Sequence, residues 1–186
     1  MRQLEVDSRR HKYYSEMIDI YHEAFPPAEC FPEEDLAALV REGRGSALVY
    51  EDTIDGEDRF VGSIYIVNDD VNVMALFLAI SKSVRGHGYG SRILGHLAEE
   101  YPEHKISLQI ETTREPVRDI ENRKRRAAFY KKNGFDYAPI VTSEPGGIFD
   151  FMVYGGMVDI EEMREFMTAV IGGDLLKKWK VDLQSL

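Results

Sequence analysis

The chain has 186 residues, of which 44% are hydrophobic and 30% charged, a composition typical of one globular domain with a sizeable core. Its 33 acidic residues exceed its 23 lysines and arginines, and the resulting net charge of −10 argues against a nucleic-acid-binding protein. The single cysteine, Cys30, excludes an internal disulfide, and the longest clean apolar run, residues 73–80, is far shorter than a membrane span. We therefore expect a cytoplasmic protein without a membrane segment.

The first part of the chain predicts a short strand, two helices and three strands. Residues 3–6 are strand-like, and apolar residues between Tyr13 and Phe25 recur at three- and four-residue steps, as in an amphipathic helix. A second helix is expected over 32–43, with acidic residues in its first turn. Strands are then predicted over 46–51, 59–68 and 71–80, and in the second of these Phe60, Gly62, Ile64 and Ile66 are expected to share one face.

The second part of the chain mixes helices and strands. The sequence predicts a helix after Gly90 that stops before Pro102, a strand over 105–111, a helix over 120–134, a hairpin of residues 135–142 and 148–155, and a helix over 159–173. The tail from Asp174 is expected to form a short helix and a frayed end. Because helices and strands do not alternate strictly, we predict a single α+β domain over residues 1–186, built around a mainly antiparallel sheet.

Three alternating glycines stand out in the segment SVRGHGYGSRIL, residues 83–94, directly behind the most apolar strand. A loop that needs only positive φ angles would be satisfied by one or two of them. The spacing of Gly86, Gly88 and Gly90 does not match the dinucleotide pattern G-x-G-x-x-G, and the ending GSR is not that of a nucleotide-hydrolase loop. A strand end with bare amides that leads into a helix N-terminus is instead typical of an anion site, and its span suits a pyrophosphate.

The segment RGHGYG resembles the Arg/Gln-x-x-Gly-x-Gly/Ala motif of the GNAT (Gcn5-related) N-acetyltransferase superfamily, and RRAAFYKKNGF, residues 125–135, resembles a second segment of that family. The resemblance implies α/β/α layers, with a central mixed, mainly antiparallel sheet flanked by helices, and acetyl-CoA as co-substrate. It also implies that the backbone of the strand end pairs with pantetheine and that the loop amides hold the pyrophosphate. The residues so implicated are Leu78, Ala79, Ile80, Arg85, Gly86, His87, Gly88, Tyr89, Gly90 and Ser91.

Two further residues are candidates for the chemistry. Tyr130 matches a tyrosine that lies near the CoA sulfur in many family members, which implies a cofactor-binding position and a proton donor to the thiolate; the alternative is a tyrosine packed on its helix. Glu111 ends the strand KISLQIE, at a position from which family members often present a carboxylate to the acceptor. It is a candidate general base, and the alternative is a solvated glutamate at a strand end.

The other charged residues do not identify the acceptor substrate. The basic cluster of the predicted helix over 120–134 is either a solvated face or a contact for the CoA 3′-phosphate. The five histidines show no metal-ligand spacing, so no metal is expected. We predict an N-acetyltransferase, a monomer or homodimer, acting on a primary amine of a small molecule or peptide. The alternative is a non-catalytic acyl-CoA-binding regulatory module.

Overall fold

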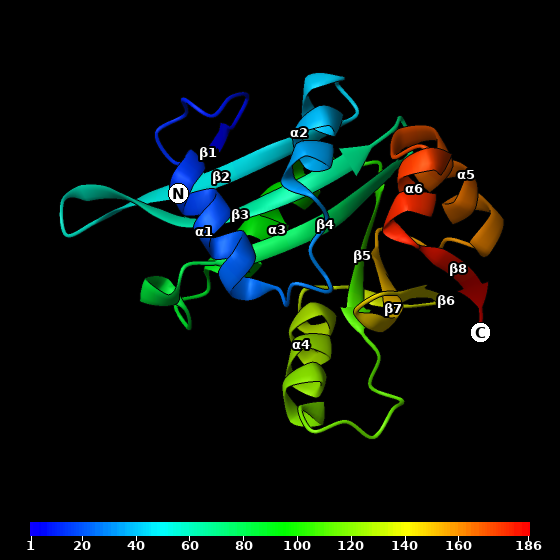
Figure 1. The fold of residues 1–186 in the computed structure, drawn as a ribbon. Helices are drawn as coiled ribbons and strands as arrows, with labels where there is room; N and C mark the ends of the chain where they lie inside the picture. The colour runs from blue at the N-terminus through cyan, green and yellow to red at the C-terminus, as the bar shows by residue number, and fades with distance from the viewer. The chain divides into compact units, whose positions relative to one another are not determined.

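The structure is a computed structural model that describes residues 1–186 (Figure 1). It contains six α-helices, eight strands and one short 3-10 helix (η1), as the sequence led us to expect for an α+β protein. In chain order they are β1 (Arg2–Glu5), α1 (Tyr14–Ala24), α2 (Glu33–Arg41), β2 (Gly45–Ile54), β3 (Glu57–Asn68), β4 (Asn72–Ile80), η1 (Lys82–Val84), α3 (Tyr89–Glu100), β5 (Lys105–Glu111), α4 (Ile120–Lys132), β6 (Asp136–Glu144), β7 (Gly147–Tyr154), α5 (Ile160–Val170), α6 (Gly173–Trp179) and β8 (Asp182–Ser185).

The strands have the hydrogen-bonded order β1-β2-β3-β4-β5-β7-β6-β8. The β1–β2, β2–β3, β5–β7, β6–β7 and β6–β8 pairs are all antiparallel, which agrees with the predicted sheet. The chain divides into two compact units, residues 1–67 with 75–100 and residues 68–74 with 101–186. The single domain stays a prediction.

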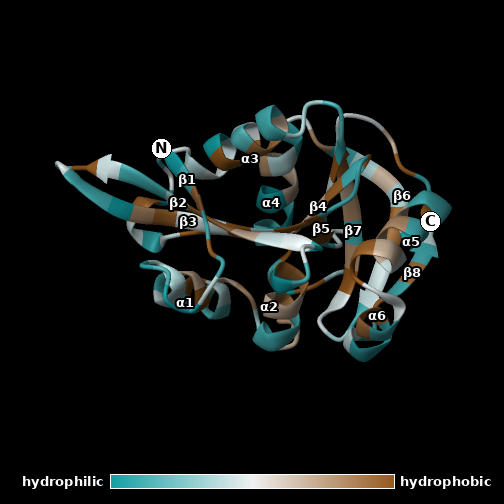
Figure 2. Cartoon of the chain, turned by 90° about the horizontal axis from the view of Figure 1, so that it is seen from above, coloured by the Kyte–Doolittle hydropathy of each residue, from teal (hydrophilic) through white to brown (hydrophobic).

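In the first unit, α1 and α2 cover one face of the sheet and α3 covers the other, as the view from above shows (Figure 2). Tyr21 of α1 packs against the rings of Tyr65 and Phe77, whose centroids lie 6.4 and 4.8 Å from its own. On the opposite face Ile93 and Leu97 of α3 are completely buried. Amphipathic helices thus bury both faces of the long apolar strands, which accounts for the nearly continuous hydrophobicity of β4.

A β-bulge changes one prediction for this sheet. Tyr50 pairs with Gly62, but Glu51 pairs with Phe60, so Val61 is the extra residue in β3. Because an extra residue reverses the alternation of side chains, Phe60 turns to the α1 side, where its ring lies 5.7 Å from that of Tyr13. The expectation that Phe60 shares a face with Ile64 and Ile66 is therefore wrong.

In the second unit, β7 lies between β5 and β6, and the predicted hairpin is confirmed as β6 and β7. The helix α5 begins at an Asp159 cap, whose carboxylate accepts a 2.9 Å hydrogen bond from the Glu162 amide. The tail corrects the sequence analysis, because the residues expected to fray form β8, in which Ser185 pairs with Ile140. None of the helices is both long and apolar enough to cross a membrane.

Candidate active site

The glycine loop joins β4 to α3 within the first unit. After β4 the chain makes the short turn η1, and Gly86 and Gly88 then both adopt φ of +83° before α3 begins at Tyr89. A methyl group built on either glycine would meet no atom within 4 Å. Glycine is therefore required here by the backbone conformation and not by lack of space, and the space beside the loop is open.

The amides of this loop are unusually free of protein partners. The His87 amide donates a 3.4 Å hydrogen bond to the Val84 carbonyl, and the Arg92 amide closes the first helical turn on Gly88. The remaining amides have no hydrogen-bond acceptor; they belong to Gly86, Gly88, Tyr89, Gly90 and Ser91. Unpaired amides at a helix N-terminus are suited to bind an anion, and the pyrophosphate contacts of this loop stay a prediction.

Side chains brace the loop from outside. Arg85 donates 2.9 Å from its Nε to the Ile80 carbonyl, and its guanidinium pairs with Glu23 of α1 at 3.2 Å. Arg85 thereby ties the loop to the end of β4 and to α1. The Arg85 side chain therefore stabilises the conformation of the loop. At the end of β4, Leu78 and Ile80 are half-exposed.

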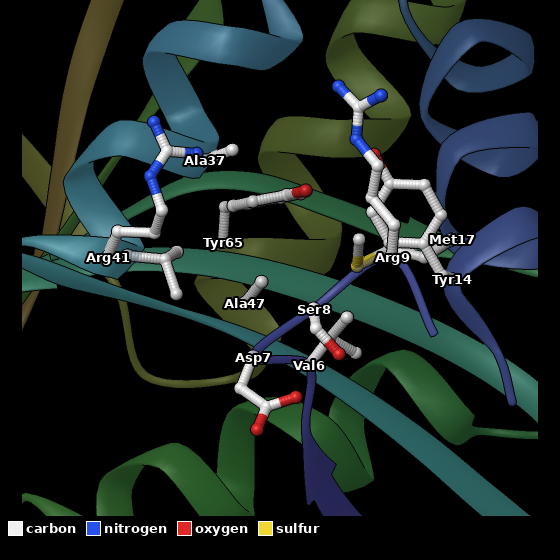
Figure 3. A pocket seen from close by; sticks show the side chains of 11 residues that line it. Val6, Asp7, Ser8, Arg9, Tyr14, Met17, Ala37, Arg41, Ala47 and Tyr65 are labelled. Carbon is white, nitrogen blue, oxygen red and sulfur yellow. The ribbon is translucent and has the colours of Figure 1, made fainter. Parts of the chain in front are cut away.

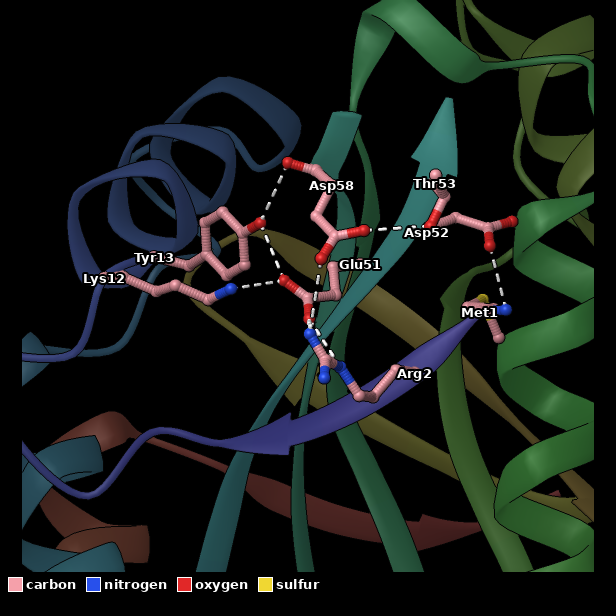
Figure 4. Close-up of polar contacts among 8 residues, drawn as sticks. All are labelled: Met1, Arg2, Lys12, Tyr13, Glu51, Asp52, Thr53 and Asp58. Atoms are coloured by element: carbon pink, nitrogen blue, oxygen red, sulfur yellow. Dashed lines mark hydrogen bonds and ion pairs between the residues drawn. The ribbon is translucent and has the colours of Figure 1, made fainter. Parts of the chain in front are cut away.

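Asp52 of β2 anchors the start of α3, a role that the sequence analysis missed. The Tyr89 hydroxyl donates to its carboxylate at 3.1 Å and Arg92 pairs with it at 2.8 Å, while the amino group of Met1 lies 2.9 Å away. Hydrogen bonds from the amino group, Arg92 and Tyr89 hold the pKa of Asp52 well below its usual range. Figure 4 shows Asp52 next to Glu51, which points to the other side of the strand. No local motif marks Asp52, because its partners come from distant segments.

Glu51 is a buried carboxylate at the base of α1 (Figure 4). Lys12 donates to it at 2.5 Å and the Tyr13 hydroxyl at 2.8 Å, and Arg2 also pairs with it. The hydrogen bond from Lys12, with those from Tyr13 and Arg2, lowers the pKa of Glu51 to about 2 against the opposing effect of burial. This cluster fastens β1 and the start of α1 to the sheet.

In the second unit, Tyr130 and Glu111 both lie close to Arg126 of α4. The Glu111 carboxylate forms ion pairs with Arg126 and, at 3.8 Å, with Arg123, and its side chain is 15% exposed. Tyr130 is half-buried, and its hydroxyl has no hydrogen-bond partner. Burial raises the pKa of Tyr130 to about 12, although the charge of Arg126 acts in the opposite direction. The phenol therefore stays protonated at neutral pH, while the side chain of Glu111 is engaged by Arg126 and Arg123.

The basic cluster of α4 is largely neutralised by its neighbours. Besides the two arginines on Glu111, Lys124 pairs with Glu121 at 2.9 Å, and Arg125 donates to Asn122. Arg118 and Lys132 are exposed and have no ion-pair partner, which leaves them available to a phosphate. Another carboxylate, that of the half-buried Glu144, accepts a 2.7 Å hydrogen bond from Gln109, and partial burial raises its pKa. The pairing of Gln109 with Glu144 joins β5 to β6, so no sequence spacing reveals it.

The family model for the acetyltransferase (GNAT) domain matches residues 43–137, which is just over half of the chain. This protein therefore belongs to the GNAT acetyltransferase family, with acetyl-CoA as co-substrate. No functionally curated protein matches its sequence.

Three solved structures illustrate the relationship. A GNAT-family acetyltransferase from Bacteroides thetaiotaomicron is 25% identical, with a TM-score of 0.69 over 92% of this chain and 99% of its own. An aminoglycoside 6′-N-acetyltransferase in complex with coenzyme A is 18% identical, with a TM-score of 0.61 over 82% of this chain and 96% of its own. A spermidine N-acetyltransferase from Vibrio cholerae is 13% identical, with a TM-score of 0.60 over 83% of this chain and 94% of its own. The last two support the fold alone.

Proposed function

We propose that this protein transfers the acetyl group of acetyl-CoA to a primary amine of a small molecule or peptide. The observation that carries the proposal is the loop from Gly86 to Ser91, whose unpaired amides match the acceptor oxygens of a pyrophosphate. The aminoglycoside and spermidine enzymes act on amines, as their names state. The acidic balance of this chain, with a net charge of −10, is compatible with a cationic acceptor.

Each part of the reaction has a candidate group in this chain. Acetyl-CoA supplies an activated thioester, and the loop amides together with the edge of β4 at Leu78–Ile80 are proposed to hold it. Tyr130 is proposed to donate a proton to the departing thiolate, because its hydroxyl is protonated and has no other partner. Glu111 is proposed to accept the proton of the amine, and Arg126 would orient its carboxylate through their ion pair.

The anion site is tested with Gly90→Asp and Gly90→Ala. Gly90 lies in the first turn of α3, where an aspartate favours the helix dipole, so the fold should be retained. The added carboxylate would repel a pyrophosphate from the neighbouring amides, whereas alanine adds a methyl group without charge. We expect CoA binding, measured by calorimetry, to fall at least a hundredfold in the aspartate variant and far less in the alanine variant. Equal affinities in the two variants would place the pyrophosphate elsewhere.

The transfer itself is tested with a panel of amines and acetyl-CoA, read by release of the free thiol. Turnover of an amine, with the acetylated product identified by mass spectrometry, would support the proposal. CoA binding without turnover of any amine would favour the non-catalytic acyl-CoA-binding module. Thiol release with acetyl transfer to a hydroxyl group would retain the acetyltransferase and contradict the amine acceptor.

A further inference from the structure

A cavity of about 300 Å³ lies in the first unit between the sheet, α1 and α2 (Figure 3). Its floor is apolar and includes Ala47 of β2, Val6 beyond β1 and Met17 of α1. Ala37 and Val40 of α2 close another side. A volume of this size is at the lower end of the range for small-molecule sites, and an apolar lining of this kind favours a ligand with a hydrocarbon or aromatic body.

Tyr65 introduces a polar atom into this apolar space. The residue is only 8% exposed, no protein group hydrogen-bonds to its hydroxyl, and the hydroxyl oxygen itself is not sealed from solvent. Burial raises the pKa of Tyr65, so its hydroxyl is a donor at neutral pH. Because this hydroxyl makes no hydrogen bond within the protein, it is free to donate one to an acceptor atom of a bound ligand. Figure 3 shows the Tyr65 side chain lying across the cavity towards Tyr14.

The cavity also carries a cation without a counter-ion. Arg41 of α2 lines it and forms no ion pair, whereas Arg9, on the other side in Figure 3, pairs with Glu34 of α2. An unpaired guanidinium beside an apolar pocket selects a planar anion such as a carboxylate, which it can bind through two parallel hydrogen bonds. Asp7 contributes a carboxylate to the lining, but Figure 3 shows it directed away from Arg41.

This cavity is separate from the anion loop. Arg85 of the loop pairs with Glu23, near the end of α1, whereas Tyr14, at its beginning, lines the cavity. Tyr14 and Glu23 are nine positions apart in the helix, which corresponds to about 13.5 Å along its axis.

We propose that this cavity binds a small monocarboxylate with an apolar body, whose carboxylate pairs with Arg41 and which also accepts a hydrogen bond from Tyr65. The proposal does not rest on the proposed acetyl transfer. The site is distinct from the glycine loop, so both ligands bind at once.

Phenylpropanoate and its uncharged amide form a matched pair of probes of about the right size. We expect calorimetry to show that the carboxylate binds at least tenfold more tightly than the amide. Arg41→Gln should remove this difference, while Arg10→Gln, which makes the same charge change at an exposed residue outside the cavity, should preserve it. Equal binding of the two probes to the unmodified protein, or an unchanged preference in Arg41→Gln, would overturn the proposal.

Two further variants locate the ligand. Ala37→Leu fills the cavity from a half-exposed helix position that leucine tolerates, so binding should be lost while the thermal midpoint is kept. Tyr65→Phe should weaken binding about threefold to tenfold through loss of one hydrogen bond. Full affinity in both variants would show that the probe binds elsewhere. Saturating CoA should leave the affinity for phenylpropanoate unchanged, and competition between the two would contradict a separate site.

Discussion

Replacing Gly88 with alanine tests whether the loop conformation is what makes the anion site. Gly88 has φ of +83°, and a methyl group there meets no atom within 4 Å, so the substitution adds backbone strain without a clash. Left-handed backbone costs an alanine about 1–2 kcal/mol. If the loop keeps its shape, the free energy of unfolding should fall by about 1–2 kcal/mol.

If the loop relaxes instead, the amides around Gly88 turn away from the site. Hydrogen bonds to a charged group contribute about 1.5–3 kcal/mol each, so the loss of one such bond should weaken CoA binding by about tenfold to a hundredfold. The strain thus reduces stability, affinity or both. Urea denaturation and calorimetric titration with CoA measure the two quantities on the same variant.

Gly95→Ala provides the matched control. Gly95 lies within α3, outside the left-handed region, and a methyl group there also meets open space. Alanine should therefore stabilise the protein by about 0.5–1 kcal/mol and leave CoA affinity unchanged. A Gly88→Ala variant with the stability and the CoA affinity of the unmodified protein would refute the argument that positive φ is needed at this position.

Three further predictions concern side chains. Tyr130→Phe should lower kcat by about a hundredfold or more when chemistry limits the rate, with CoA affinity nearly unchanged, and an unaltered kcat would reject the proton-donor role. If the Glu111 carboxylate is the base, Glu111→Gln should lower kcat by a factor of about 10²–10⁴, and the loss should be smaller at high pH. Reduced stability with normal kinetics would instead mean that Glu111 only holds α4 in place through Arg126. Glu51→Gln should remove up to about 3 kcal/mol of stability at pH 7, since the pKa of Glu51 falls from 4.5 to about 2 on folding. That contribution is complete above pH 4.5 and is lost as the pH falls towards 2. Denaturation should therefore show a smaller difference in stability between Glu51→Gln and the unmodified protein at pH 3 than at pH 7. An equal difference at both pH values would contradict the linkage.

Much of the fold follows from local sequence. The helices and the long strands were predictable because their apolar residues recur at the helical or strand period, and because proline and glycine mark their ends. The glycine loop between a strand and a helix was predictable for the same kind of reason, since all three are consecutive in the chain, whereas its binding of an anion stays a prediction. The motif also allowed the family to be identified before the fold was known.

Other features depend on contacts between distant residues and were decided only by the tertiary structure. The strand β8 is too short to be recognised alone, and it forms because the free edge of β6 offers hydrogen bonds to Ser185 and its neighbours. The bulge at Val61 moves Phe60 to the other face, and the neighbouring Gly62 is only a weak local sign of it.

For the polar and charged groups, too, the sequence predicted the candidates and the tertiary structure decided their partners. The residue types of Glu111 and Tyr130 made them candidates, but the ion pair of Glu111 with Arg126 and the unpartnered hydroxyl of Tyr130 follow from the packing of α4. The lining of the cavity beneath α1 and α2 likewise depends on the tertiary structure, which brings Arg41 and Tyr65, distant in sequence, to the same space. Sequence periodicity sets which face of an element is apolar, whereas only packing determines which polar groups find partners and which remain free to bind a ligand.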